Sequence, residues 1–244
     1  MAHLSRKHIL FNDDTFHLIW RCHNKNWLLK PNEAKSLYYN LLLKYKEEYD
    51  VKVYSYCFMT NHIHMTGKCK TVEGISGLMR TVNSVFSKRI NKRLGRCGQV
   101  IMDRFKSPAI QTDQDLLNVM RYIDLNPCRA KMVNHPKYYK WSSFAYYAYG
   151  KNDSLITPAP SYLAISEASS IRMDLYTEMV ENLWLERNKS TDKNSYSRAL
   201  FIGNPDWVIT RYCYIKSLNK IKRESSFEKL RCEYNSENKF LSSV

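Results

Sequence analysis

A pair of adjacent strand-like segments constrains the fold of this chain more than any other feature of its sequence. Residues 51–59 (VKVYSYCFM) are rich in β-branched and aromatic residues, and residues 62–69 (HIHMTGKC) follow after the polar pair Thr60–Asn61. Side chains of this kind favour extended strands, and a short polar break between two such runs is typical of a hairpin turn. The sequence therefore predicts two antiparallel strands joined by a short turn.

The other segments provide elements that would extend and cover this hairpin. A strand is predicted over 16–22, and a strand or hairpin over 99–112. Apolar residues at three- and four-residue spacing indicate helices, which we expect over 33–48, 76–96, 113–126 and 138–148. Thr112 or Asp113 should cap the helix over 113–126, and Pro127 should end it. This order of elements is typical of the α+β class, as a ferredoxin-like sandwich with helices packed on one face of an antiparallel sheet.

Positive charge is concentrated in the first part of the chain. The formal net charge is +15, and residues 1–150 contain 24 Lys and Arg against 11 Asp and Glu, whereas residues 151–244 contain 14 against 12. A domain as basic as the first part implies an anionic partner, most commonly nucleic acid, although a merely soluble basic surface is an alternative. We therefore expect one domain over 1–150 and a mostly helical C-terminal extension of unknown role over 151–244.

The helix predicted over 76–96 carries the densest group of these cations. Its apolar positions recur at helical spacing, and they are Leu78, Met79, Val82, Val85, Phe86, Ile90 and Leu94. The other faces carry cations suited to DNA phosphates, namely Arg80, Lys88, Arg89, Lys92 and Arg93. A solvated helix face explains the same cations equally well when this segment is taken alone.

Composition excludes several classes of protein. Hydrophobic residues make up 44% of the chain, which is enough to bury a core and excludes wholesale disorder. No apolar run reaches the roughly 18 residues that a membrane span requires, and the first residues lack the apolar stretch of a signal peptide. The seven cysteines form no CxxC pair, so neither a disulfide framework nor a Cys-rich zinc site is indicated. We expect a cytoplasmic protein with reduced, mostly buried thiols and no membrane partner.

Two histidines and a tyrosine could meet in one site. His62 and His64 lie two apart in the predicted strand, so their side chains leave the same face and could bind one metal ion. Tyr122 and Asn126 lie four apart and stack on one face of the predicted helix. The Asn126 amide oxygen would add a third ligand and place the Tyr122 hydroxyl within a helical turn of the ion, where it could attack a bound phosphate. Neither the histidine pair nor Tyr122 is strong evidence for a site on its own. A bare HxH pair is often structural, and most of the 18 tyrosines must be packed in the core or lie on the surface.

Four strings of residues carry a resemblance to a known family. They are YSYCFMTNHIHM, GQVIMDRFKS, MRYIDLNPCRA and WSSF, in this order. Together they resemble the single-tyrosine HUH transposases, and most closely the REP-associated tyrosine transposases, over roughly residues 8–150. A histidine pair combined with a downstream Tyr-x-x-x-Asn-Pro is far more specific than either part. The resemblance implies an RRM-like α+β sandwich, which agrees with the ferredoxin-like fold expected above.

The resemblance also implies an activity and a role for each site residue. By the family pattern, His62 and His64 are the metal ligands, Tyr122 is the nucleophile and Asn126 is the additional ligand. The implied protein is a metal-dependent single-stranded DNA endonuclease and strand transferase that acts beside hairpins through a 5′-phosphotyrosine intermediate. The family favours Mg²⁺ with Mn²⁺ as a substitute, whereas imidazole ligands alone would favour Mn²⁺. No residue is identified as a general base, and both a monomer and a homodimer are compatible with the sequence.

The chain departs from the family pattern at two places. Thr60 stands where relatives usually have proline, and Met102–Asp103 replace a more usual Gln-Gly. Neither place holds an implied metal ligand or nucleophile, so we expect only the local DNA contacts to differ. The next three residues, Arg104, Phe105 and Lys106, combine two cations with a ring that could stack on a base, although a core position for Phe105 is equally consistent.

Two other functions are compatible with the same residues. A non-catalytic protein that binds hairpin or single-stranded nucleic acid would use the same basic, aromatic-rich sheet, with the HxH pair as a relic or a structural feature. A metal-dependent nuclease would attack the phosphate with water instead of with Tyr122. Formation of a covalent adduct on Tyr122 would distinguish the transposase from both.

Overall fold

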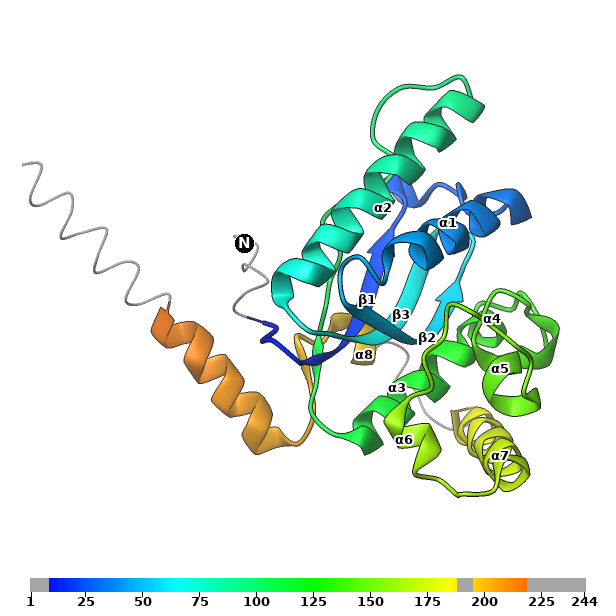
Figure 1. Cartoon of the computed structure of the whole chain (residues 1–244), viewed down its shortest axis with the longest axis vertical. Coiled ribbons are helices and arrows are strands. Elements are labelled where there is room, and N and C mark those ends of the chain that lie inside the picture. Colours follow the sequence, from blue (N-terminus) through cyan, green and yellow to red (C-terminus); the bar gives the residue numbers. More distant parts are fainter. Residues whose placement is uncertain (1–8, 188–194, 219–244) are drawn as a thin grey trace, which may run out of the picture. The chain divides into compact units, whose positions relative to one another are not determined.

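The structure, a computed structural model, describes residues 9–187 and 195–218. These residues divide into two compact units, one that ends at Gly203 and one that begins at Asn204. The first unit contains the sheet and the helices labelled in Figure 1. In the second unit, residues 205–218 form a helix.

Within the described residues, a five-stranded sheet has the order β2-β3-β1-β4-β5. The strands are β1 (Thr15–Arg21), β2 (Val51–Phe58), β3 (His62–Cys69), β4 (Ala109–Ile110) and β5 (Phe201–Ile202). The hairpin of β2 and β3 is antiparallel, as predicted, and β1 pairs antiparallel with β3. The parallel pairing of β4 with β5 makes the sheet mixed, and β5 was not predicted as a strand.

Helices are the other regular elements in the described part of the first unit, and the α+β class is confirmed. They are α1 (Asn32–Tyr45), α2 (Val72–Arg93), α3 (Asp113–Asp124), α4 (Asn126–Arg129), α5 (Phe144–Tyr149), α6 (Pro160–Leu163), α7 (Ser169–Arg187) and α8 (Ser195–Arg198), with short 3₁₀ turns η2 (His23–Lys25) and η3 (Pro136–Tyr138). The described residues after 150, which are 151–187 and 195–218, are mostly helical, as expected. The helix predicted over 138–148 is shorter than expected, because only α5 forms there.

The helix predicted over 113–126 begins where it was expected but ends earlier. The Thr112 hydroxyl accepts a hydrogen bond from the Asp115 N–H, while the Asp115 carboxylate accepts one from the Thr112 N–H, so the two residues form a capping box. α3 ends at Asp124, and Asn126 begins the separate short helix α4. Pro127 lies in the first turn of α4, where its missing N–H costs no helical hydrogen bond.

Helices cover both faces of the sheet, so the expectation that they occupy one face was wrong (Figure 1). Trp20 of β1 donates a hydrogen bond to Tyr38 of α1, and Tyr38 in turn donates to Asn83 of α2. His17 of β1 lies on the opposite face, where its ring is 6.2 Å from that of Tyr122 on α3. Because successive residues of a strand point to opposite faces, β1 separates α1 and α2 from α3.

The end of α2 also differs from the prediction. Leu78, Met79, Val82, Phe86 and Ile90 are buried, as their helical spacing predicted. Leu94 was predicted to belong to the same apolar face, but 54% of it is exposed. The helix ends at Arg93, so Leu94 no longer follows the helical path that would bring it to the sheet.

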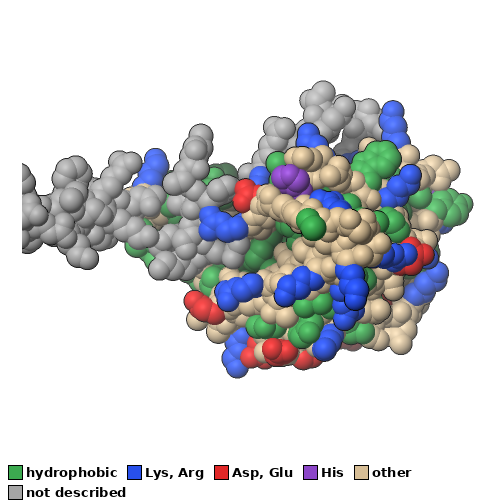
Figure 2. Space-filling model, turned by 90° about the horizontal axis from the view of Figure 1, so that it is seen from above, with side chains coloured by type: hydrophobic (Ala, Val, Ile, Leu, Met, Phe, Trp, Pro, Cys, Tyr) green, Lys and Arg blue, Asp and Glu red, His purple; other side chains and the backbone are tan. Residues whose placement is uncertain are grey.

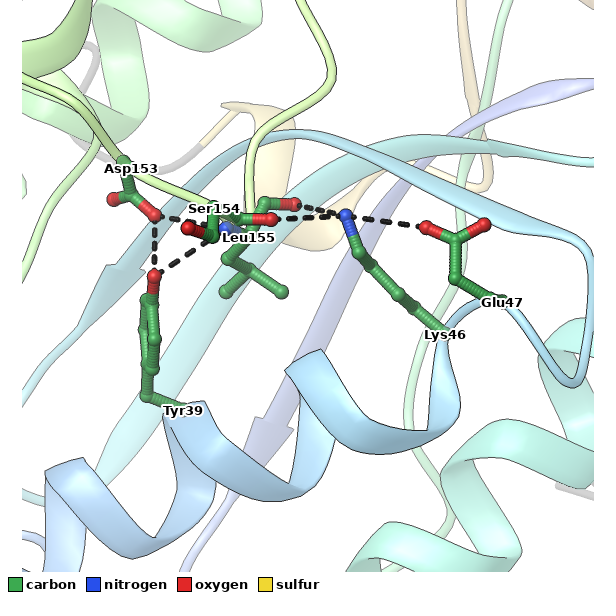
Figure 3. A network of polar contacts seen from close by, with 6 residues as sticks. All are labelled: Tyr39, Lys46, Glu47, Asp153, Ser154 and Leu155. Carbon is green, nitrogen blue, oxygen red and sulfur yellow. Dashed lines mark hydrogen bonds and ion pairs between the residues drawn. The ribbon is translucent and has the colours of Figure 1, made fainter.

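The segment that follows α5 is anchored to α1 and the sheet (Figure 3). Tyr39 donates a hydrogen bond to Asp153, and the Lys46 ammonium donates to the carbonyls of Ser154 and Leu155. Tyr56 of β2 donates to the other carboxylate oxygen of Asp153. Residues beyond 150 are therefore part of the first compact unit, and the domain boundary at residue 150 stays a prediction about where the catalytic domain ends.

A buried carboxyl group joins α3 to the later helices. Asp124 is completely buried, and it accepts hydrogen bonds from Tyr176 of α7 at 2.7 Å and from Ser143 at 3.1 Å. Burial raises the pKa of Asp124 to about 7, although these two hydrogen bonds oppose the rise. α7 thus holds the end of the helix that carries Tyr122.

Two expectations from composition concern the thiols and the membrane. The six cysteines in the described part of the chain are all free, and Cys22, Cys57, Cys69 and Cys128 are buried. Cys232 lies outside the described residues. Across the described ranges, no helix combines the length and the apolar character that crossing a bilayer would require.

Candidate active site

The predicted histidine pair lies on β3, where it faces α3. His62 is partly exposed and His64 is buried, and their ring centroids are 5.0 Å apart. His62 and His64 are separated by one residue in β3, so their side chains project from the same face of the sheet, as predicted. The intervening Ile63 is buried opposite Trp20 on the other face.

The turn before β3 fixes which nitrogen of His62 can bind a metal. The Asn61 amide nitrogen donates a hydrogen bond to the Lys25 carbonyl, so the Asn61 amide oxygen is the atom that faces His62 Nδ1 at 2.7 Å. Because an amide oxygen only accepts, His62 Nδ1 must carry the hydrogen. In the neutral ring the lone pair then lies on Nε2, which is the arrangement that a metal ligand needs.

A third histidine, His17 of β1, lies against the pair and was not predicted. Its Nε2 is 3.0 Å from His64 Nδ1, and the two rings stack with centroids 5.2 Å apart. If His64 Nδ1 donates to His17 Nε2, then His64 presents the lone pair of Nε2, in the same way as His62. His17 would therefore fix the orientation of the His64 ring through Nδ1, the nitrogen that does not bind the metal. The alternating strand FHLIWRC shows which face His17 occupies, but sequence alone does not give its register against β3.

All three imidazoles are neutral near pH 7. Burial lowers the pKa of His17 to about 3, and the backbone of Tyr196 only partly opposes this. Burial, together with the charge of Arg21, lowers the pKa of His62 to about 4. The pKa of His64 is held well below its ordinary value by burial and then by the neighbouring His62 and His17. Neutral rings are the form that coordinates a metal ion.

Tyr122 of α3 lies close to these rings. Its ring centroid is 6.1 Å from that of His64 and 6.2 Å from that of His17. The sheet and α3 therefore bring the phenol and the imidazoles close together, as the predicted site requires. Only 3% of Tyr122 is exposed, and its hydroxyl is 2.9 Å from the hydroxyl of Ser197 on α8. The neighbouring Tyr196 packs edge-on against the Tyr122 ring at 5.1 Å.

Arg129 connects Tyr122 with Asn126. Its guanidinium lies 4.0 Å from the centre of the Tyr122 ring, and it donates hydrogen bonds of 2.9 Å to the Tyr122 carbonyl and to Asn126 Oδ1. Asn126 is buried at the start of α4, and its Nδ2 makes no hydrogen bond within the described residues. The amide oxygen keeps a second lone pair that could bind an ion. Sequence reasoning selected Asn126 but missed Arg129.

The residues present fit a divalent metal ion, with a limited set of donors. Among the described residues, no three His, Cys, Asp or Glu side chains gather as a potential metal site. The candidate ligands are instead the Nε2 atoms of His62 and His64 and the amide oxygen of Asn126, which Arg129 connects to Tyr122. Nitrogen and neutral oxygen donors suit Mn²⁺ and related ions and accept Mg²⁺ when substrate oxygens complete the shell.

The cations predicted to bind DNA fall into two groups. Arg80, Lys88, Arg89, Lys92 and Arg93 are exposed on α2, and Arg93 is 3.8 Å from Glu33. They lie on the side of the sheet that α1 and α2 cover, away from the histidines. Figure 2 shows Lys and Arg side chains spread over one face of the molecule, with fewer acidic ones between them.

The second group, Arg104, Phe105 and Lys106, runs beside β1. Lys106 pairs with Ile19 in an antiparallel bridge, and Ile19 stands opposite His64 in the sheet. Lys106 therefore belongs to the face of the histidines, and it is exposed, as is Arg104. Phe105 is half-buried, so it is neither a free stacking surface nor a core residue.

Comparison with known proteins supports the resemblance inferred from the motifs. Residues 11–126 match the family described as "Transposase IS200 like", and this stretch includes both histidines, Tyr122 and Asn126. A solved structure of a REP-associated tyrosine transposase bound to a REP hairpin shares the fold with a TM-score of 0.51. The alignment covers 64% of this chain and 92% of that chain at 17% sequence identity. No curated protein sequence gave a significant match. The resemblance to the tyrosine transposases is thus confirmed.

Proposed function

We propose that this chain, whose residues 11–126 match the IS200-like transposases, cleaves and rejoins single-stranded DNA beside hairpins through a 5′-phosphotyrosine intermediate. The observation that carries the proposal is the position of the Tyr122 ring, whose centroid is 6.1 Å from that of His64 and 6.2 Å from that of His17. A nucleophile and a phosphate-activating site must lie this close for a phosphoryl transfer to be efficient.

In the proposed reaction, the Tyr122 oxygen attacks a phosphorus atom of the DNA backbone. A bond forms between the phenol oxygen and phosphorus, and the bond from phosphorus to the 3′ oxygen breaks. The phenol loses its proton, and the departing 3′ oxygen takes up a proton. The DNA stays joined to Tyr122 through its 5′ phosphate and leaves a free 3′-hydroxyl. Attack by another 3′-hydroxyl reverses the exchange and joins strands without ATP, because the covalent link retains the free energy of the phosphodiester.

His62, His64 and Asn126 would hold the divalent ion, Mg²⁺ or Mn²⁺, that supplies charge neutralisation at the phosphate. Asn61 and His17 contribute by fixing the two imidazole rings so that each can present Nε2. Arg129 holds the Tyr122 ring and the Asn126 amide relative to each other. These contacts support the proposal, because they restrict the orientations of the His62, His64, Tyr122 and Asn126 side chains.

The proposed substrate is single-stranded DNA next to a hairpin. The related transposase of known structure is bound to a REP hairpin, and the exposed cations of α2 together with Arg104 and Lys106 could hold the phosphates of such a partner. We propose that the protein acts in the cytoplasm on such DNA, as a monomer or a homodimer.

The test is a search for the covalent adduct. The full chain is incubated with Mg²⁺ and labelled hairpin oligonucleotides taken from the DNA that flanks its gene, each with a single-stranded flank. Mass spectrometry should find nucleotide attached to Tyr122, and Tyr122→Phe should lose both adduct and cleavage. Tyr138→Phe is a matched control, because Tyr138 is 62% exposed on η3 outside the site and should leave both unchanged.

Each alternative predicts a different result. Binding of the hairpins without any adduct in the panel would identify a non-catalytic binding protein. Cleavage that persists in Tyr122→Phe would identify a nuclease that attacks with water.

A further inference from the structure

Arg21 lies beside the histidine pair at the end of β1. In the register of β1 and β3, Arg21 stands directly opposite His62, while Ile19 stands opposite His64. Opposed residues of an antiparallel pair project from the same face, so Arg21 shares the face of both imidazoles. Its side chain is exposed. The guanidinium is thus on the side of the sheet where a charged group bound to the histidine pair would lie.

The fold itself does not use this guanidinium. Across residues 9–187 and 195–218, no carboxylate forms an ion pair with Arg21, and no side-chain hydrogen bond involves it. The backbone of Arg21 is held separately, because its carbonyl accepts a hydrogen bond of 2.8 Å from the Met102 N–H. An arginine with five donors and no acceptor from the described residues is available for a ligand.

The charges around the pair indicate which ligand this is. A divalent ion bound to the histidine pair would place positive charge next to Arg21, and the two would repel each other. An anion between them converts this repulsion into attraction on both sides. The non-bridging oxygens of a phosphodiester match the fork of a guanidinium, which makes this anion a natural occupant.

We propose that Arg21 binds a non-bridging oxygen of the phosphate that Tyr122 attacks, an inference that rests on the proposed function. While the bond from Tyr122 to phosphorus forms and the bond to the 3′ oxygen breaks, negative charge is spread over the non-bridging oxygens. Arg21 neutralises that charge at the atoms where the reaction occurs. It therefore affects the rate of the reaction more than the affinity for DNA. The cations of α2 cannot replace it, because they lie on the other side of the sheet.

The test compares Arg21→Ala and Arg21→Lys with Lys52→Ala in the full chain. Lys52 is an exposed cation of β2 that pairs with Lys68, on the histidine face but about 20 Å along the sheet from His62. Lys52→Ala and Arg21→Ala each lower the net charge by one. The measurements are the rate of adduct formation on a labelled hairpin with a single-stranded flank, the affinity for that hairpin, and thermal unfolding.

Arg21→Ala should slow adduct formation by about 100-fold, the loss typical when one donor to developing charge is removed, and should change hairpin affinity less than threefold. Arg21→Lys keeps the charge without the fork, so its rate should fall between those of wild type and Arg21→Ala. Lys52→Ala should match wild type. If Arg21→Ala does not fold, Arg21→Gln and Arg21→Lys take its place in the comparison.

Two results would overturn the inference while leaving the proposed function intact. One is an adduct rate for Arg21→Ala within threefold of wild type. The other is a loss of affinity as large as the loss of rate, which would show that Arg21 grips DNA away from the cleaved phosphate. If wild type and Lys52→Ala both form no adduct, the proposed function fails, and this inference fails with it.

Discussion

Replacing Asp124 by asparagine tests whether a neutral carboxyl group ties the nucleophile helix α3 to α7. In the folded unit, Asp124 keeps its proton up to about pH 7, because burial raises its pKa from the ordinary 3.8 to about 7. In the unfolded chain the proton leaves near pH 4. Between these two values unfolding releases a proton, so the free energy of unfolding falls as the pH rises.

The magnitude follows from the two pKa values. Each pKa unit corresponds to 1.36 kcal/mol, so the penalty for ionising Asp124 grows to about 4 kcal/mol between pH 4 and pH 7 and is constant above that. The amide of the substituted side chain does not ionise, and it can still pair with Tyr176 and Ser143. We therefore expect the free energy of unfolding of Asp124→Asn, relative to wild type, to rise by about this amount between pH 4 and pH 8.

The assay is urea unfolding followed by circular dichroism at several pH values from 4 to 8. The three histidines of the site have lowered pKa values and so destabilise the folded state as the pH falls below about 6.5. They are present in both proteins, so their effect cancels in the difference. Asp174→Asn, which makes the same charge change at an exposed position of α7, is the control and should follow wild type. A difference between Asp124→Asn and wild type that stays constant within about 0.5 kcal/mol across this range would refute the reasoning.

Three further predictions concern the site and the DNA surface. His64→Ala should abolish cleavage while hairpin affinity, measured by gel shift, stays within about tenfold of wild type; joint loss of affinity and folding would make His64 a structural residue. His17→Phe should keep the fold but weaken Mn²⁺ binding, measured by calorimetry, by about 10- to 100-fold, and unchanged binding would show that His17 does not orient His64. Lys92→Ala should lower the slope of log affinity against log salt by about one, whereas an unchanged slope would remove Lys92 from the DNA interface.

The local features of the fold could be predicted because they depend on neighbouring residues. The hairpin around Thr60–Asn61 and the cap at Thr112 are determined by side chains within a few positions of each other. β5 could not be predicted, since Phe201–Ile202 is too short to show a pattern and pairs with a strand about 90 residues earlier. The division of helices between two faces was missed for a related reason: strand alternation shows that β1 has two apolar faces, but not which helix covers each.

The candidate site was partly predictable for similar reasons. The spacing of His62 to His64 is local, and these two rings lie close to that of Tyr122 on α3. Asn126 was selected by its spacing from Tyr122, but it begins the separate helix α4. His17, Arg21 and Arg129 approach them through strand register or the turn into α4, which the sequence does not specify.

The pairing of β5 with β4 has a consequence for how the protein is made. Ala109 pairs with Phe201 and Ile110 pairs with Ile202. β5 can therefore pair with β4 only after Ile202 has been translated. Until then the nascent polypeptide exposes an unpaired strand edge, a surface on which other chains can add, and the Tyr122 hydroxyl lacks its neighbour Ser197. The proposed site is thereby completed late in synthesis, even though every residue proposed to act there has been translated once residue 129 is added.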